Sequence, residues 1–132
     1  YLGSRRIRVS ARQQLSETLL ATGIPFRLHE GTDTSKKFMG QLESVMEKLA
    51  GVRRYGSAAL DLAYVAAGRY EGFWENGLNS WDVAAGVVLV REAGGFVNEI
   101  NGKRYMLGSP DILATNDPLQ GTLQKLLSDA NS

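Results

Sequence analysis

Two carboxylates on either side of a predicted sharp turn are the residues of this chain most able to do chemistry. Glu75 ends an aromatic run that is typical of a strand, the Asn76-Gly77 pair breaks it, and Asp82 is expected in the first turn of a new helix. With no lysine between them, the two acids suggest a cation or polyol site. The spacing alone leaves a simpler interpretation open, because a helix dipole stabilises an aspartate in the first turn by roughly 0.3 to 1 kcal/mol and a glutamate at a strand end can simply be solvated.

The composition bounds the class of protein. A chain of 132 residues is the size of one domain and buries roughly two-thirds of its unfolded surface. Hydrophobic residues make up 43% and charged residues 22%, and the net charge is +1, so neither disorder nor a basic nucleic-acid-binding surface is indicated. The absence of cysteine excludes disulfides and thiolate metal sites. Since the sequence has no long apolar segment, we expect a soluble, cytoplasmic protein without a membrane partner.

The elements that must position the two carboxylates alternate between strands and helices. Strands are predicted at 6–10, 19–23, 52–55, 70–75, 96–100 and 111–115, and the first of them is expected in a hairpin with the chain start. Helices are predicted at 33–49, 58–67 and 81–93, and a last one is expected to begin with Asp117 as its N-cap. The first helix places Phe38, Leu42, Val45, Met46 and Leu49 on one apolar face. The pattern predicts a layered α/β domain over 1–132, with a mixed, mostly parallel sheet covered by helices on both faces.

Other candidate residues carry weaker signals. Gly56, Ser57 and Ala58 precede or open the alanine-rich helix, where free backbone N–H groups can meet an oxygen-rich ligand, although such a pair is more often only a helix cap. His29, the only histidine, is expected to be a surface or structural residue. The arginines near the chain start and at 53–54 fit a solvated strand face better than a phosphate patch. Trp74 and Trp81 are expected in the core or a dimer interface.

A longer pattern carries a resemblance. Gly56-Ser57-Ala58-Ala59, Glu75, the Trp81-Asp82-Val83-Ala84-Ala85-Gly86 element and Glu92-Ala93-Gly94-Gly95 together resemble the C-terminal half of the inositol monophosphatase family, closest to its bacterial extragenic-suppressor (SuhB-like) branch. The resemblance covers essentially the whole chain. It implies a magnesium-dependent, lithium-sensitive hydrolase of small polyol phosphates such as inositol monophosphate, working as a homodimer and requiring Mg²⁺.

The resemblance also implies residue roles. Asp82 would be a magnesium ligand near a substrate hydroxyl and so the catalytic residue of this chain. Glu75 would bind substrate hydroxyls, together with Gly56, Ser57 and Ala58, although many relatives have threonine in place of Ser57. The pair Asn79-Ser80 departs from several relatives, so substrate preference does not transfer with the motif.

One departure concerns the metal site. The family's other metal ligands come from an N-terminal half that is not in this sequence, and 117–122 resembles the family's Asp-Pro-Leu-Asp-Gly-Thr motif but has Gln120 where the second aspartate is needed. We therefore expect this chain alone to have little or no activity. Fructose bisphosphate and phosphoadenosine phosphate remain alternative substrates. The competing function class is a non-catalytic module that binds a protein of the transcription or ribosomal RNA processing machinery.

Overall fold

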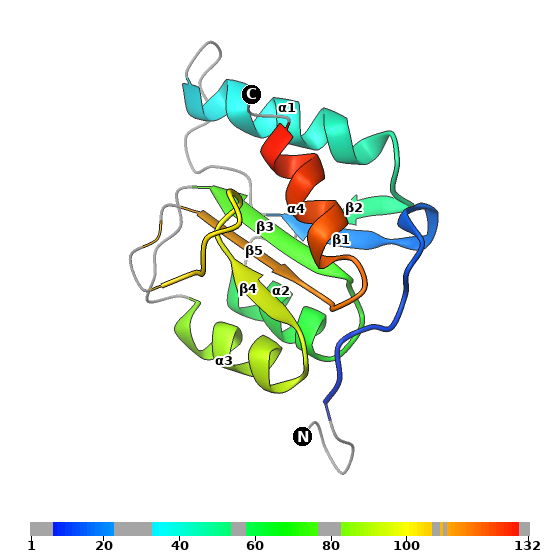
Figure 1. The fold of residues 1–132 in the computed structure, drawn as a ribbon, viewed down its shortest axis with the longest axis vertical. Helices are drawn as coiled ribbons and strands as arrows, with labels where there is room; N and C mark the ends of the chain where they lie inside the picture. The colour runs from blue at the N-terminus through cyan, green and yellow to red at the C-terminus, as the bar shows by residue number, and fades with distance from the viewer. Residues whose placement is uncertain are drawn as a thin grey trace.

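The sheet is mixed and has five strands. The computed structural model describes residues 7–22, 33–53, 58–76, 83–106, 109 and 111–129. Its strands, in the spatial order β2-β1-β3-β5-β4 (Figure 1), are β1 (Leu19–Thr22), β2 (Gly51–Arg53), β3 (Gly72–Asn76), β4 (Phe96–Asn98) and β5 (Asp111–Thr115). β1 pairs in parallel with β2 and β3, whereas β5 pairs antiparallel with β3 and β4. The mixed layered α/β fold predicted from the sequence is confirmed.

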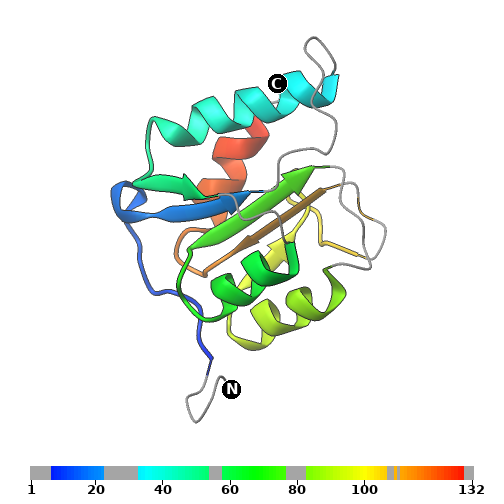
Figure 2. The same cartoon turned by 180° about the vertical axis from the view of Figure 1, so that it is seen from behind.

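Two helices cover each face of this sheet. α1 (Asp33–Met46) and α4 (Gln120–Asp129) lie on one face, and α2 (Ala58–Ala66) and α3 (Ala84–Glu92) lie on the other, as the front and back views show (Figures 1 and 2). A short 3-10 helix, η1 (Leu15–Glu17), leads into β1. The order is helix, sheet, helix, so each strand has to bury side chains in both directions.

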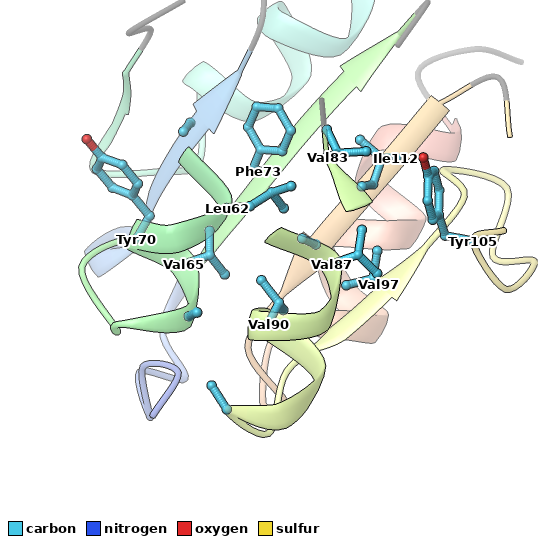
Figure 3. Packing of buried hydrophobic residues seen from close by; sticks show 14 residues of the cluster. Leu62, Val65, Tyr70, Phe73, Val83, Val87, Val90, Val97, Tyr105 and Ile112 are labelled. Carbon is cyan, nitrogen blue, oxygen red and sulfur yellow. The ribbon is translucent and has the colours of Figure 1, made fainter. Parts of the chain in front are cut away.

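The alternation of side chains along the strands builds two separate cores. In β3, Phe73 points into the core under α2 and α3, and Trp74 into the core under α1 and α4. Figure 3 shows the first core, where Leu62, Val65, Val87 and Val90 of the two helices meet the sheet. Both aromatic residues are fully buried, as expected for Trp74. Trp81 lies outside the described residues. The period of two in β3 therefore decides which face each neighbouring residue reaches.

Several local predictions are wrong. Residues 7–10 form no strand; the Val9 N–H donates instead to the Ala93 carbonyl at 3.1 Å, beside the end of α3. Met46 is 63% exposed, so it does not share the buried face of Phe38 and Val45. The residue that caps the start of α4 is Asn116, whose Oδ1 accepts the Leu119 N–H at 3.1 Å, and not Asp117. An Asx cap one residue earlier satisfies a first-turn amide equally well.

Candidate active site

The chain connections bring the starts of α2 and α3 to the end of the sheet at which β3 finishes. We call this end of the sheet, where Glu75 lies, the carboxylate edge. α2 is joined to β3 by 67–71 only, so it runs antiparallel to β3, and its start lies beside the end of β3. α3 follows β3 and also runs back, which places its start at the same edge (Figure 2). Gly86 fits against Leu62, since a Cβ at this position would lie 2.7 Å from the Leu62 Cβ. The first turn of α3 therefore packs directly against the middle of α2.

Glu75 lies at this edge and on this face. It is the fourth residue of β3, two positions after Phe73, so its side chain belongs to the face that α2 and α3 cover. Its Cα partner on β5 is Ile112, and its side chain is half-buried. The strand is predicted to end at Glu75, but it continues by one residue to Asn76, which pairs with Asp111 of β5. A half-buried carboxylate beside two helix starts can accept hydrogen bonds from ligand hydroxyls while the strand ladder holds its backbone.

Of the other predicted site residues, the structure describes Ala58. Ala58 is the first residue of α2 and is half-buried. Gly56, Ser57 and Asp82 lie outside the described residues, and so does His29. α3 itself begins at Ala84, with Val83 as its N-cap and no side-chain hydrogen bond to that cap. The first amides of both helices belong to the edge where Glu75 stands, and free helix N–H groups favour anionic ligands.

Asp61 is a buried carboxylate that sequence reasoning missed. It stands in the first turn of α2, its side chain is 1% exposed, and neither carboxylate oxygen has a hydrogen-bond partner in the part of the chain that the structure describes. Burial raises the pKa of Asp61 to about 6. The signal in the sequence that could have revealed its burial is its place as one acid in a helix of small apolar residues. It stands four positions before the buried Val65, and residues four apart share one face of a helix. A buried carboxylate without donors is costly unless a proton, a cation or a ligand joins it.

The other buried carboxylates differ from Asp61 because they are paired. Glu71 accepts the Leu19 N–H at 2.7 Å, which ties the start of β3 to β1. Asp111 accepts the Ile100 N–H at 2.8 Å and lies 3.5 Å from the Lys37 ammonium of α1. These two acids stabilise the fold. Asp61, by contrast, has no hydrogen-bond or ion-pair partner among the residues that the structure describes.

A buried amide pair fixes the end of β3 from the opposite face. The Gln41 Oε1 of α1 accepts hydrogen bonds from Trp74 Nε1 at 3.0 Å and from Asn76 Nδ2 at 2.7 Å. Phe38 stacks on Trp74 with ring centroids 6.5 Å apart. Because Trp74 and Asn76 flank Glu75 in the strand, α1 holds the backbone on both sides of the site carboxylate. Such support limits the movement of a binding group.

The donor set suits a hard divalent cation but is incomplete. Mg²⁺ prefers carboxylate oxygens, and Glu75 and Asp61 are carboxylates on the same face and edge. Among the described residues, however, no group of three His, Cys, Asp or Glu side chains is close enough to hold a metal ion. Further ligands would have to come from outside these residues. None of the described helices is long and apolar enough to cross a membrane.

Comparison with known proteins decides the family. The model of the inositol monophosphatase family matches residues 1–132, the whole chain. The chain belongs to the inositol monophosphatase family. This confirms the family resemblance drawn from the motifs around Glu75 and Asp82.

Individual relatives agree with this assignment. The chain is 48% identical over 125 residues to an inositol-1-monophosphatase of Mesorhizobium japonicum, covering 95% of this chain and 46% of that protein. It is 49% identical over 115 residues to Nus factor SuhB of Pseudomonas aeruginosa, covering 87% and 42%. The solved structure of an inositol monophosphatase from Anabaena superposes with a TM-score of 0.88 at 40% identity, covering 96% of this chain and 49% of that one. The chain thus spans about half the length of the curated relatives it matches.

Proposed function

We propose that the protein, as encoded by its gene, is a magnesium-dependent hydrolase of phosphate monoesters, acting on inositol monophosphate or a similar small polyol phosphate. The observation that carries the proposal is the meeting of Glu75 with the starts of α2 and α3 at one sheet edge, in a chain that matches the inositol monophosphatase family over its whole length. This chain would supply one metal ligand and the wall that recognises the polyol.

Each residue of the wall has a chemical reason for its role. Glu75 accepts hydrogen bonds from substrate hydroxyls, because a carboxylate has only acceptors to offer. Gly56, Ser57 and Ala58 present helix-start amides to ligand oxygens, and their small side chains permit close approach. Asp82, two residues before the start of α3 in the sequence, is the proposed metal ligand and catalytic residue. Bound Mg²⁺ would supply charge stabilisation for the phosphoryl group and activation of water.

The remaining ligands and the assembly belong to the same proposal. With one metal ligand of its own, the 132-residue chain would have little or no turnover, and the water-activating carboxylates would come from a sequence equivalent to the other half of the relatives. This chain would then be the C-terminal half of the active unit. We propose lithium sensitivity and a homodimer as further properties. Both follow from family membership.

A second function is favoured by a specific similarity. Relatives named Nus factor SuhB, such as that of Pseudomonas aeruginosa, match as well as those named inositol-1-monophosphatase. The alternative is therefore a protein whose main role is to bind a partner of the transcription or ribosomal RNA processing machinery. In that case the carboxylate edge would be dispensable for partner binding.

One set of variants tests both functions in the protein as encoded. We expect Asp82→Asn to lower magnesium-dependent release of phosphate from inositol monophosphate by about 100-fold or more, since a metal supplies several kcal/mol of transition-state stabilisation. Glu75→Gln should mainly raise KM. The matched control is Glu47→Gln, an exposed acid immediately after α1, which should leave turnover unchanged. Absence of magnesium-dependent activity in the unchanged protein would contradict the enzyme proposal, and activity that survives Asp82→Asn would contradict the role of Asp82. An inactive Asp82→Asn variant with full partner binding would separate the two functions.

A further inference from the structure

A small cavity at the other end of α3 is lined by two arginines. It has a volume of about 180 Å³ and lies between the last turn of α3, the edge strand β4 and the hairpin that follows β4. Figure 1 shows β4 at the outer edge of the sheet, next to α3. The lining residues are Arg91, Gly95, Phe96, Val97, Asn98 and Arg104. No carboxylate is among them.

The guanidinium of Arg91 is held in place before any ligand arrives. Its Nη2 donates to the Val97 carbonyl at 3.1 Å and to the Tyr105 carbonyl at 3.1 Å. The side chain is half-buried, and the two carbonyls belong to both strands of the hairpin. Arg104 faces the same cavity from the hairpin, where its backbone bridges to Asn98. A fixed guanidinium loses little conformational entropy on binding, so the site is preorganised.

The charges around this cavity are unbalanced. Burial lowers the pKa of Arg91, the positive charge of Arg104 lowers it further, and the Tyr105 phenol acts in the opposite direction. The described part of the chain shows one ion pair, between Lys37 and Asp111, so neither arginine is paired with a carboxylate there. Glu99, the nearest acid of the hairpin in sequence, accepts hydrogen bonds from Ser109 and Asn101 instead. Two adjacent guanidiniums without an acid favour an anion between them.

We propose that the cavity formed by Arg91, Arg104 and Asn98 is a binding site for a phosphate group. Guanidinium groups match the geometry of phosphate oxygens and bind them through charge-assisted hydrogen bonds. The Asn98 amide offers another donor. Phe96 lines the same cavity and is 43% exposed, so a phosphate ester with a flat ring could place that ring on the phenyl group.

Binding is measured with inorganic phosphate and with phenyl phosphate, by NMR of the arginine side-chain N–H signals and by calorimetry. The protein as encoded is used, at low ionic strength and with chelator in place of magnesium, so that metal-dependent binding at the carboxylate edge does not contribute. We expect saturable shifts of the Arg91 signal with both ligands. Phenyl phosphate should bind more tightly, and Phe96→Ala should remove that advantage.

Arg104→Ala decides the matter, because Arg104 is exposed and its truncation leaves the hydrogen bonds of Arg91 in place. The variant should weaken phosphate binding by about 10-fold or more, since hydrogen bonds to charged groups are individually strong. Lys103→Ala is the matched control, because Lys103 is an exposed neighbouring cation that does not line the cavity. Absence of a phosphate-dependent Arg91 signal, or equal loss in both variants, would overturn the proposal and leave Arg91 as a structural clamp only.

Discussion

At the scale of single residues, Glu75 and Asp61 differ in their surroundings: Glu75 is half-buried in β3, whereas Asp61 is buried in the first turn of α2. Glu75 could be predicted because a strand signal ends beside it. Asp61 could not, because a lone acid in a helix is usually solvent-exposed, and only packing shows that its side chain is 1% exposed. The cap at Asn116 escaped for a related reason, since Asn116 and Asp117 are both good caps and the register of α4 decides between them.

The buried Asp61 carboxyl makes stability depend on pH. Its pKa is raised to about 6 by burial, so the folded state favours the neutral form. The stability that this group contributes is fully present below its unfolded pKa of 3.8 and is lost as the pH rises through about 6. We expect Asp61→Asn to raise the free energy of unfolding by about 3 kcal/mol at pH 7.5 and by about 1 kcal/mol at pH 4.5. Urea unfolding in chelator measures both values. The control is Asp117→Asn at an exposed position, which should change the free energy of unfolding by less than about 0.5 kcal/mol at either pH. If Asp61→Asn changed the free energy of unfolding by the same amount at both pH values, the argument would be refuted.

At the scale of elements, the order of helices and strands was predictable, whereas their ends and neighbours were not. The run 84–92 is apolar enough to predict α3, but the requirement for glycine at 86 comes from α2. A Cβ there would lie 2.7 Å from both Cβ and Cδ1 of Leu62. Similarly, the alternating pattern at 6–10 predicted a strand, yet the Val9 N–H of this segment donates to the Ala93 carbonyl beside the end of α3 and not to a strand. The hydrophobic periodicity of a segment predicts which of its residues are buried, but it does not predict the element against which they pack.

The contact between α2 and α3 is therefore sensitive to one methyl group. Gly86→Ala should lower the free energy of unfolding by about 1 to 3 kcal/mol, because a tightly packed interface must move to admit the Cβ. Gly121→Ala is the matched control in α4: no atom lies within 4 Å of the added Cβ, so the variant should gain up to about 1 kcal/mol from helix propensity. Chemical unfolding of the two variants side by side gives the comparison. Equal effects would mean that Leu62 repacks freely and that α2 and α3 are not held in fixed contact at Gly86.

At the scale of the whole molecule, the chain has complete cores on both faces of its sheet and yet spans about half the length of its relatives. The sequence predicted this combination through the missing metal-ligand motif. What it could not predict is which surface remains apolar. On the outer layer, Leu60 of α2 is 43% exposed, and Val88 and Leu89 of α3 are 53% and 38% exposed. Exposed apolar side chains on neighbouring helices favour association.

We expect the 132-residue chain by itself to fold and to self-associate through α2 and α3, while lacking magnesium-dependent phosphatase activity. Val88→Asp should weaken this association by about 10-fold or more, which corresponds to about 1.4 kcal/mol, because burying a valine is worth at least that much and burying a charge is costly. Met46→Asp is the control, since Met46 is 63% exposed on α1, across the sheet. Sedimentation velocity over a concentration series measures both variants. If Met46→Asp prevents self-association and Val88→Asp does not, the chain associates through α1. The exposed apolar side chains of α2 and α3 would then not form an interface.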